Sequence, residues 1–128
     1  DWACHQLAHE LGGKYDAAHG AALAAVWGSW ARYVYQENPE RFAQFATNVF
    51  DIPYSTDFEQ TALLGIEAME AFFRSVDMPT NLHELGLDLT DEQLHELAFG
   101  CSYEDTRTIG VFKQLNRKDM EKIYQMAR

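Results

Sequence analysis

The chain has 128 residues, of which 47% are hydrophobic, which is enough for one hydrophobic core and too little for several ordinary domains. Its formal net charge of −10 and its pI near 4.7 exclude the basic surface by which proteins bind nucleic acids or anionic membranes. The longest apolar run, residues 21–27, is far shorter than the roughly 20 residues of a transmembrane helix, and no signal-peptide pattern opens the chain.

The first expected helix carries two of the five histidines. His5 and His9 are four residues apart, so they lie on one helical face, separated by about 6 Å along the axis. Gly12-Gly13 predicts the end of this helix, because glycine is weak in helix interiors and common at C-caps. Asp16 is expected to cap a second helix that starts at Ala17.

His19 falls in the first turn of that second helix, fourteen residues after His5. On one unbroken helix the two side chains would lie about 21 Å apart. A tight turn between the helices would instead bring them together, and we predict that the two imidazoles approach each other. Trp2 shares the face of His5 and His9, where an exposed helix would carry Lys or Glu, so this face is typical of a cleft wall. Trp2 either lines that cleft or packs against another domain.

The later segments predict further helices and no strand, so the expected fold is an all-α helical bundle with residues 1–128 as one domain. The Ala-rich segment 17–36 is apolar nearly all round, which indicates a central helix. Four more helices are expected: from an Asn38 cap to about residue 50, from the capping box at 56–59 to Pro79, from a Thr90 capping box to Gly100, and from an Asn116 cap onward.

Two of these helices have a predicted buried stripe. In the helix that ends before Pro79, the spacing predicts a buried stripe of Leu63, Ile66, Met69, Glu70 and Phe73. In the last helix, the predicted stripe is Met120, Ile123, Tyr124 and Ala127. His83 and His95 lie among polar residues and are expected at the surface, and Trp27 and Trp30 are expected in the core rather than against a substrate.

The N-terminal pattern resembles a known enzyme family. His5-x-x-x-His9-x-Leu11-Gly12, followed by residues 16–20 (Asp-Ala-Ala-His-Gly) and an Ala-rich helix, is similar to the C-terminal helical half of iron-dependent alcohol dehydrogenases. The resemblance is strongest to the branch of NADP-dependent butanol dehydrogenases and aldehyde reductases, and it weakens after about residue 80. The fold it implies is the helical domain shared with the dehydroquinate synthase-like enzymes.

The resemblance implies a role for each histidine. His5 and His19 would be two ligands of a divalent metal, iron(II) with zinc as the alternative, and His9 would line the active site as a group that orients substrate or relays a proton. The parent enzyme would use NADP(H), interconvert small alcohols with aldehydes or ketones, and form a homo-oligomer. The family's other two ligands, an Asp and a His on an earlier helix, have no counterpart here, and no G-x-G-x-x-G loop occurs.

We therefore expect this chain to be a fragment of a larger two-domain enzyme, inactive alone and metal-free or only adventitiously occupied, its missing partner being the N-terminal nucleotide-binding domain. Two alternatives remain open: a stand-alone helical interaction module, and the same fold in a dehydroquinate synthase-like lyase. Only two cysteines occur, Cys4 and Cys101, and they form no CxxC pair, which favours a location in the reducing cytoplasm.

Overall fold

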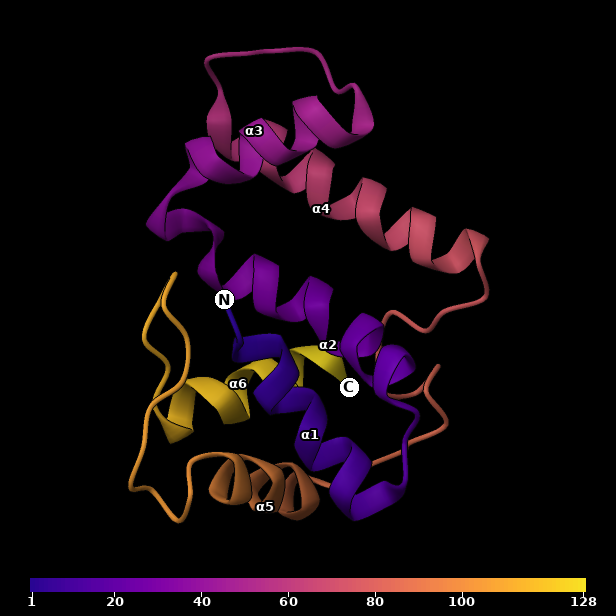
Figure 1. The fold of residues 1–128 in the computed structure, drawn as a ribbon, viewed down its shortest axis with the longest axis vertical. Coiled ribbons are helices and arrows are strands. Elements are labelled where there is room, and N and C mark those ends of the chain that lie inside the picture. The colour runs from indigo at the N-terminus through magenta and orange to yellow at the C-terminus, as the bar shows by residue number, and fades with distance from the viewer.

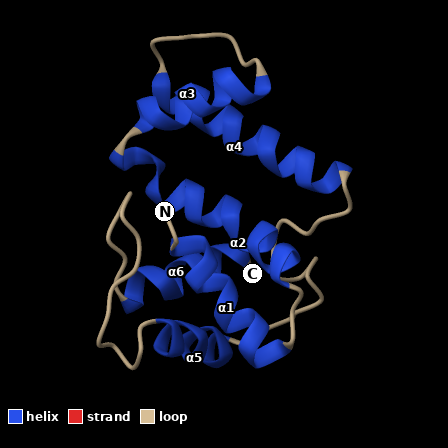
Figure 2. Ribbon diagram, in the orientation of Figure 1, coloured by secondary structure: helices blue, strands red, loops and turns tan.

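The computed structural model describes all 128 residues and consists of helices and loops (Figures 1 and 2). The only strand-like pairing is a single antiparallel bridge between Ile109 and Leu115. The prediction of an all-α fold is confirmed. In chain order the helices are α1 (Ala3–Tyr15), α2 (His19–Val34), the short 3-10 helix η1 (Tyr35–Glu37), α3 (Pro39–Phe50), α4 (Phe58–Ser75), α5 (Asp91–Cys101) and α6 (Arg117–Ala127).

Helix α2 is the central element of the fold (Figure 1). It contacts α1 and α6 on one side and α4 on the other, while α3 and α4 pack on each other at one end of the molecule. Its buried residues are mostly small, as expected for a helix that neighbours approach closely on several sides: Ala22, Ala24, Ala25, Val26, Gly28, Ser29, Ala31 and Val34.

The main core lies among α1, α2, α5 and α6. The stripe predicted for the last helix is confirmed, because Met120, Ile123, Tyr124 and Ala127 are all fully buried. Leu7 and Leu11 of α1 and Leu94 and Leu97 of α5 are fully buried in the same cluster. None of the helices combines the length and apolar composition needed to cross a membrane.

Local capping residues explain where three of the helices begin. The side chain of Asn38 accepts a hydrogen bond from Arg41 N, and both Thr90 and Asn116 form reciprocal capping boxes with the residue three positions later. These side chains satisfy N–H groups that have no partner inside the helix. The fourth predicted start is displaced by one residue, because Asp57 caps α4 through Gln60 N.

The buried stripe predicted for α4 is only partly right. Ile66 and Glu70 are buried, but Leu63 is 36% exposed, and Met69 and Phe73 are half-buried. The face that α4 buries against its neighbours is instead smaller, and comprises Thr61, Ala62, Gly65, Ile66 and Glu70. Small side chains on this face allow close contact with α3, whose Ala46 lies directly against Gly65.

Replacing Gly65 with alanine is expected to force α3 and α4 apart. The added Cβ would lie 2.5 Å from the Cβ and 3.0 Å from the Cα of Ala46, which is fully buried and belongs to a helix that cannot move locally. Overpacking costs about 1–3 kcal/mol, whereas the better helix propensity of alanine returns about 1 kcal/mol. We therefore expect a net loss of up to about 2 kcal/mol in urea unfolding. Gly13→Ala is the matched control, since nothing lies within 4 Å of its added Cβ, and it should not destabilise.

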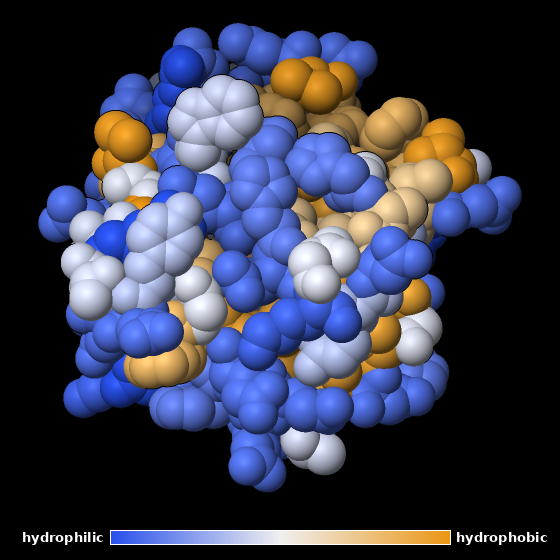
Figure 3. Space-filling view, turned by 60° about the horizontal axis from the view of Figure 1, so that its bottom comes forward, coloured by the Kyte–Doolittle hydropathy of each residue, from blue (hydrophilic) through white to orange (hydrophobic).

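The surface is mostly hydrophilic on the face shown in Figure 3, with apolar side chains exposed in separate patches. Several large apolar side chains of α4 and the loop after it are exposed, among them Leu64, Phe72, Val76 and Met78. Single exposed apolar side chains are normal on a globular protein, whereas a large contiguous patch marks a surface that contacts another chain or domain.

Candidate functional site

A three-residue turn reverses the chain between α1 and α2. Asp16 adopts the left-handed conformation, with φ of 55°, and its N–H donates to the carbonyl of Gly12. The N–H of Ala17 reaches back to the carbonyl of Leu11, and Ala18 is extended before α2 starts at His19. The prediction of a break is confirmed, but its details are wrong: α1 continues through Gly12-Gly13 to Tyr15, and Asp16 ends α1 instead of capping α2.

The turn brings the histidines of the two helices together. The ring centroids of His5 and His19 are 5.5 Å apart, so the predicted approach of these imidazoles across fourteen residues is confirmed. His9 also reaches His19, with the ring centroids 5.8 Å apart and the planes inclined by 30°. His5 is half-buried, whereas His9 and His19 are exposed.

The separation of His5 and His19 suits coordination of one metal ion. Two imidazoles bound to a tetrahedral ion, with metal–nitrogen bonds of about 2.0–2.1 Å, have ring centroids about 5 Å apart. No set of three His, Cys, Asp or Glu side chains is arranged to hold a metal in this structure. The donor set within the chain is therefore a pair of imidazoles, which fits iron(II) or zinc as part of a larger shell.

The neighbouring cysteine does not extend this donor set. Cys4 is buried, and burial raises the pKa of its thiol to about 12, so it is protonated at neutral pH. A thiol must be deprotonated to bind a metal ion well. Trp2 is 67% exposed, and its ring lies edge-on to His5 with the centroids 4.7 Å apart. It therefore forms a wall of the histidine cluster on the solvent side.

An apolar cavity of about 500 Å³ opens beside His5. Its lining combines residues of α2 with the end of α4 and the loop after it, and the sequence prediction did not include these residues in the site: Leu23, Ala24, Trp27, Trp30, Phe73 and Met78. The signal was present in the spacing, because Leu23, Trp27 and Trp30 follow His19 along one face of α2. Trp27 and Trp30 are half-buried and pack on the core, so their predicted core position is correct for one side of each ring.

The indole of Trp30 has an unusual feature for a packed side chain. Its Nε1–H is buried and has no hydrogen-bond acceptor.

His83 and His95 lie far along the chain from the other three histidines. Both are exposed, as predicted, and Nδ1 of each is bound to a carboxylate. The histidine cluster thus contains His5, His9 and His19 only.

Comparisons with known proteins match the whole chain to one enzyme family. The sequence model of the C-terminal part of the Fe-containing alcohol dehydrogenase family matches residues 1–128. The probable NADH-dependent butanol dehydrogenase 1 of Bacillus subtilis is 38% identical over 129 residues, which cover 99% of this chain and 32% of that protein. The NADPH-dependent aldehyde reductase YqhD of Escherichia coli is 32% identical over 88 residues, covering 69% of this chain and 22% of that enzyme.

Solved structures extend the likeness to the fold. The NADH-dependent butanol dehydrogenase A of Thermotoga maritima superposes with a TM-score of 0.87 at 31% identity, over 99% of this chain and 33% of that one. The E. coli aldehyde reductase YqhD superposes with a TM-score of 0.89 at 25% identity, over 100% of this chain and 33% of that one. The chain spans about a third of the length of these relatives. Its sequence and fold place it in the Fe-containing alcohol dehydrogenase family, where it corresponds to the C-terminal helical part.

Proposed function

We propose that the chain is the metal-binding helical half of an NAD(P)H-dependent alcohol dehydrogenase or aldehyde reductase that interconverts small alcohols with aldehydes or ketones. The observation that carries this proposal is the 5.5 Å separation of the His5 and His19 rings at the α1–α2 turn. The names of the relatives, which are dehydrogenases and reductases, support an oxidoreductase over a lyase.

Each histidine has a distinct part in the proposal. His5 and His19 hold the divalent metal, iron(II) with zinc as the alternative, through neutral imidazole nitrogens. A bound metal would polarise the substrate oxygen, and the nicotinamide would supply or accept the hydride. His9 lies against His19 and is exposed, so it can orient the substrate or move a proton to and from solvent.

The remaining parts of the site come from elsewhere in a longer polypeptide. Two imidazoles fill only half of a four-ligand shell, and the family resemblance implies that an Asp and a His complete it. The apolar cavity beside His5 suits a face that another segment covers. We assign the nucleotide-binding domain and the missing ligands to that longer polypeptide. Relatives named for NADH and for NADPH both occur, and we propose NADP(H) on the resemblance to the aldehyde reductase branch.

Metal titration of the 128-residue chain tests the pair of ligands. We expect anaerobic Fe(II) or Zn(II) to bind weakly, because the chain offers two neutral donors and no carboxylate. His5→Ala and His19→Ala should each remove this binding. Calorimetry and the NMR shifts of the imidazole protons report it.

His83→Ala is the matched control, because His83 is an exposed histidine beside Asp88 and outside the cluster. Its loss should leave the titration unchanged. Metal binding that survives His5→Ala would remove His5 from the site. Tight stoichiometric binding by the unaltered chain would show that two imidazoles suffice and that the missing ligands matter less than proposed.

A further inference from the structure

Helix α6 is hydrogen-bonded to the first histidine-bearing helix. The hydroxyl of Tyr124 in α6 donates to the backbone carbonyl of Leu7 in α1 at 2.7 Å. Leu7 lies midway between His5 and His9, on the opposite, fully buried face of α1. A second contact reaches the adjacent carbonyl, because the thiol of Cys101 in α5 lies 3.5 Å from the oxygen of Gln6.

The hydrogen bond from Tyr124 fixes one point of α1 relative to α6. Tyr124 is fully buried, so its hydroxyl has no access to water, and an unsatisfied hydroxyl in an apolar core is costly. Apolar packing alone would tolerate a small slide or rotation of α1, whereas a 2.7 Å hydrogen bond to one particular carbonyl does not. The turn of α1 that separates His5 from His9 is therefore held at one position.

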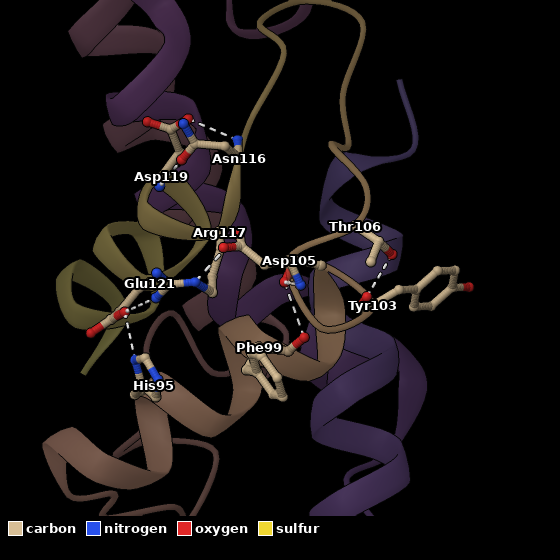
Figure 4. A network of polar contacts seen from close by, with 10 residues as sticks. His95, Phe99, Tyr103, Asp105, Thr106, Asn116, Arg117, Asp119 and Glu121 are labelled. Carbon is tan, nitrogen blue, oxygen red and sulfur yellow. Dashed lines mark hydrogen bonds and ion pairs between the residues drawn. The ribbon is translucent and has the colours of Figure 1, made fainter.

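The same helix is also bonded to the second histidine-bearing helix. The hydroxyl of Tyr33 in α2 donates to Oδ1 of Asp119 in α6 at 2.6 Å, and this hydrogen bond raises the pKa of Tyr33 to about 12. Asp119 is fixed in its turn, because its Oδ2 accepts from the backbone N–H of Asn116 in the capping box of α6. Figure 4 shows Asp119 and Asn116 joined at the start of that helix.

Helix α6 is joined by polar contacts to α5 and to the loop that follows α5. Glu121 binds Nδ1 of His95 in α5 at 3.1 Å and the guanidinium of Arg117 at 3.5 Å, while Arg117 also reaches Asp105 in the loop after α5 (Figure 4). Single exposed ion pairs contribute little, but a linked set restricts the motion of the helix that carries it. Both histidine-bearing helices are thus hydrogen-bonded to the same helix, α6.

We propose that Tyr124 and Tyr33 are positioning residues for the histidine pair: through α6 they set the distance between the rings of His5 and His19. The proposal rests on the proposed function for its purpose, because a preformed spacing matters only if both imidazoles bind one ion. The geometry itself is independent of any metal. Removing the hydroxyl of Tyr124 or Tyr33 should change the separation of the two histidine rings, in addition to any loss of stability.

Tyr124→Phe and Tyr33→Phe in the 128-residue chain test this directly. Each variant keeps the aromatic ring and removes one hydrogen bond. We expect the NMR cross-relaxation between ring protons of His5 and His19 to fall in the metal-free protein. Zn(II) affinity should also fall, by roughly three- to tenfold, as expected for one hydrogen bond. The double variant should show both effects more strongly.

Two controls separate positioning from stability. Tyr54→Phe removes a hydroxyl from an exposed tyrosine, and Ile66→Val thins the packing of α4, which carries no histidine. Neither should change the cross-relaxation between the histidine rings, although Ile66→Val should lower the urea midpoint. Unchanged cross-relaxation in Tyr124→Phe and Tyr33→Phe, with a lowered midpoint, would overturn the inference. Reduced cross-relaxation in a chain whose Zn(II) binding survives His5→Ala would support the inference and contradict the proposed function.

Discussion

The 128-residue chain is expected to transfer no hydride from NADPH to an aldehyde, even when Fe(II) is supplied. Under the proposed function it holds two of the metal ligands, His5 and His19, and the apolar side of the cleft beside them. Hydride transfer requires the nicotinamide to be held within reach of the reacting carbon, and positioning of this kind accounts for about 7–11 kcal/mol of the barrier. Without it, the catalysed rate is indistinguishable from background.

The assay follows NADPH absorbance with butyraldehyde as substrate, and a full-length relative serves as the positive control. In that full-length context, the residue equivalent to His5 should be essential, whereas the residue equivalent to the exposed His83 should not. Aldehyde reduction by the purified chain alone, lost in its His5→Ala variant, would contradict the division of labour proposed here. It would mean that the helical part contains a complete site.

Helix starts were predictable because their chemistry is local. Asn38, Thr90 and Asn116 cap α3, α5 and α6 through side-chain bonds to an N–H three residues later, which a sequence shows directly. Asp16 was assigned wrongly because aspartate suits two places: an N-cap, and the left-handed residue that ends a helix. The choice depends on the path of the chain, and packing of α1 on α2 decides it.

The pairing of His5 with His19 was predictable for a different reason. Their spacing excludes one straight helix if they are to meet, so a turn was needed, and the left-handed Asp16 and the extended Ala18 make it. The lining of the cavity beside His5 was not predicted, because Phe73 enters it from α4 and Met78 from the loop after α4, about 70 residues along the chain. Such contacts depend on tertiary packing, and hydrophobic periodicity does not show which distant segments pack together.

Two other tertiary features escaped prediction. Glu70 of α4 is buried and forms an ion pair with Arg32 of α2, and its carboxylate occupies the space over Gly28 where any larger residue would have a side chain. Sequence periodicity marked Glu70 only as a polar exception. Its partner Arg32 lies 38 residues earlier, on α2. No local sequence pattern shows which face α2 turns toward α4.

The loop after α5 contains three consecutive residues in the left-handed conformation, Tyr103, Glu104 and Asp105. Each costs roughly 1–2 kcal/mol for a residue with a Cβ, so a sequence rule would not predict three in a row. The side chain of Arg107 offsets this cost by lying 3.5 Å from the centre of the Tyr103 ring and donating to the carbonyl of Cys101 at 2.9 Å.

Alkaline pH is expected to destabilise the chain between about pH 9 and pH 12. In this range several thiol and phenol groups keep their protons in the folded chain and lose them in the unfolded chain. Burial raises the pKa of Cys101 from 9.0 to about 12, and it raises the pKa of Tyr124 well above 10.0. The hydrogen bond to Asp119 raises the pKa of Tyr33 to about 12. The unfolded chain therefore loses these protons first as the pH rises.

The number of protons that each state binds determines how the free energy of unfolding changes with pH. Below pH 9 both states hold the protons and the full stability is present, whereas between pH 9 and 12 the unfolded state binds fewer protons and the free energy of unfolding falls. For Cys101 alone, three pKa units correspond to on the order of 4 kcal/mol by pH 12. Urea unfolding at pH 8, 9, 10 and 11 measures the slope. Cys4 contributes over the same range, because burial also raises its pKa to about 12. Cys101→Ala should therefore reduce the slope above pH 9, and Tyr33→Phe should reduce it only above pH 10. Equal midpoints at pH 8 and pH 11 in the unaltered chain would contradict protonated thiols and phenols as the cause.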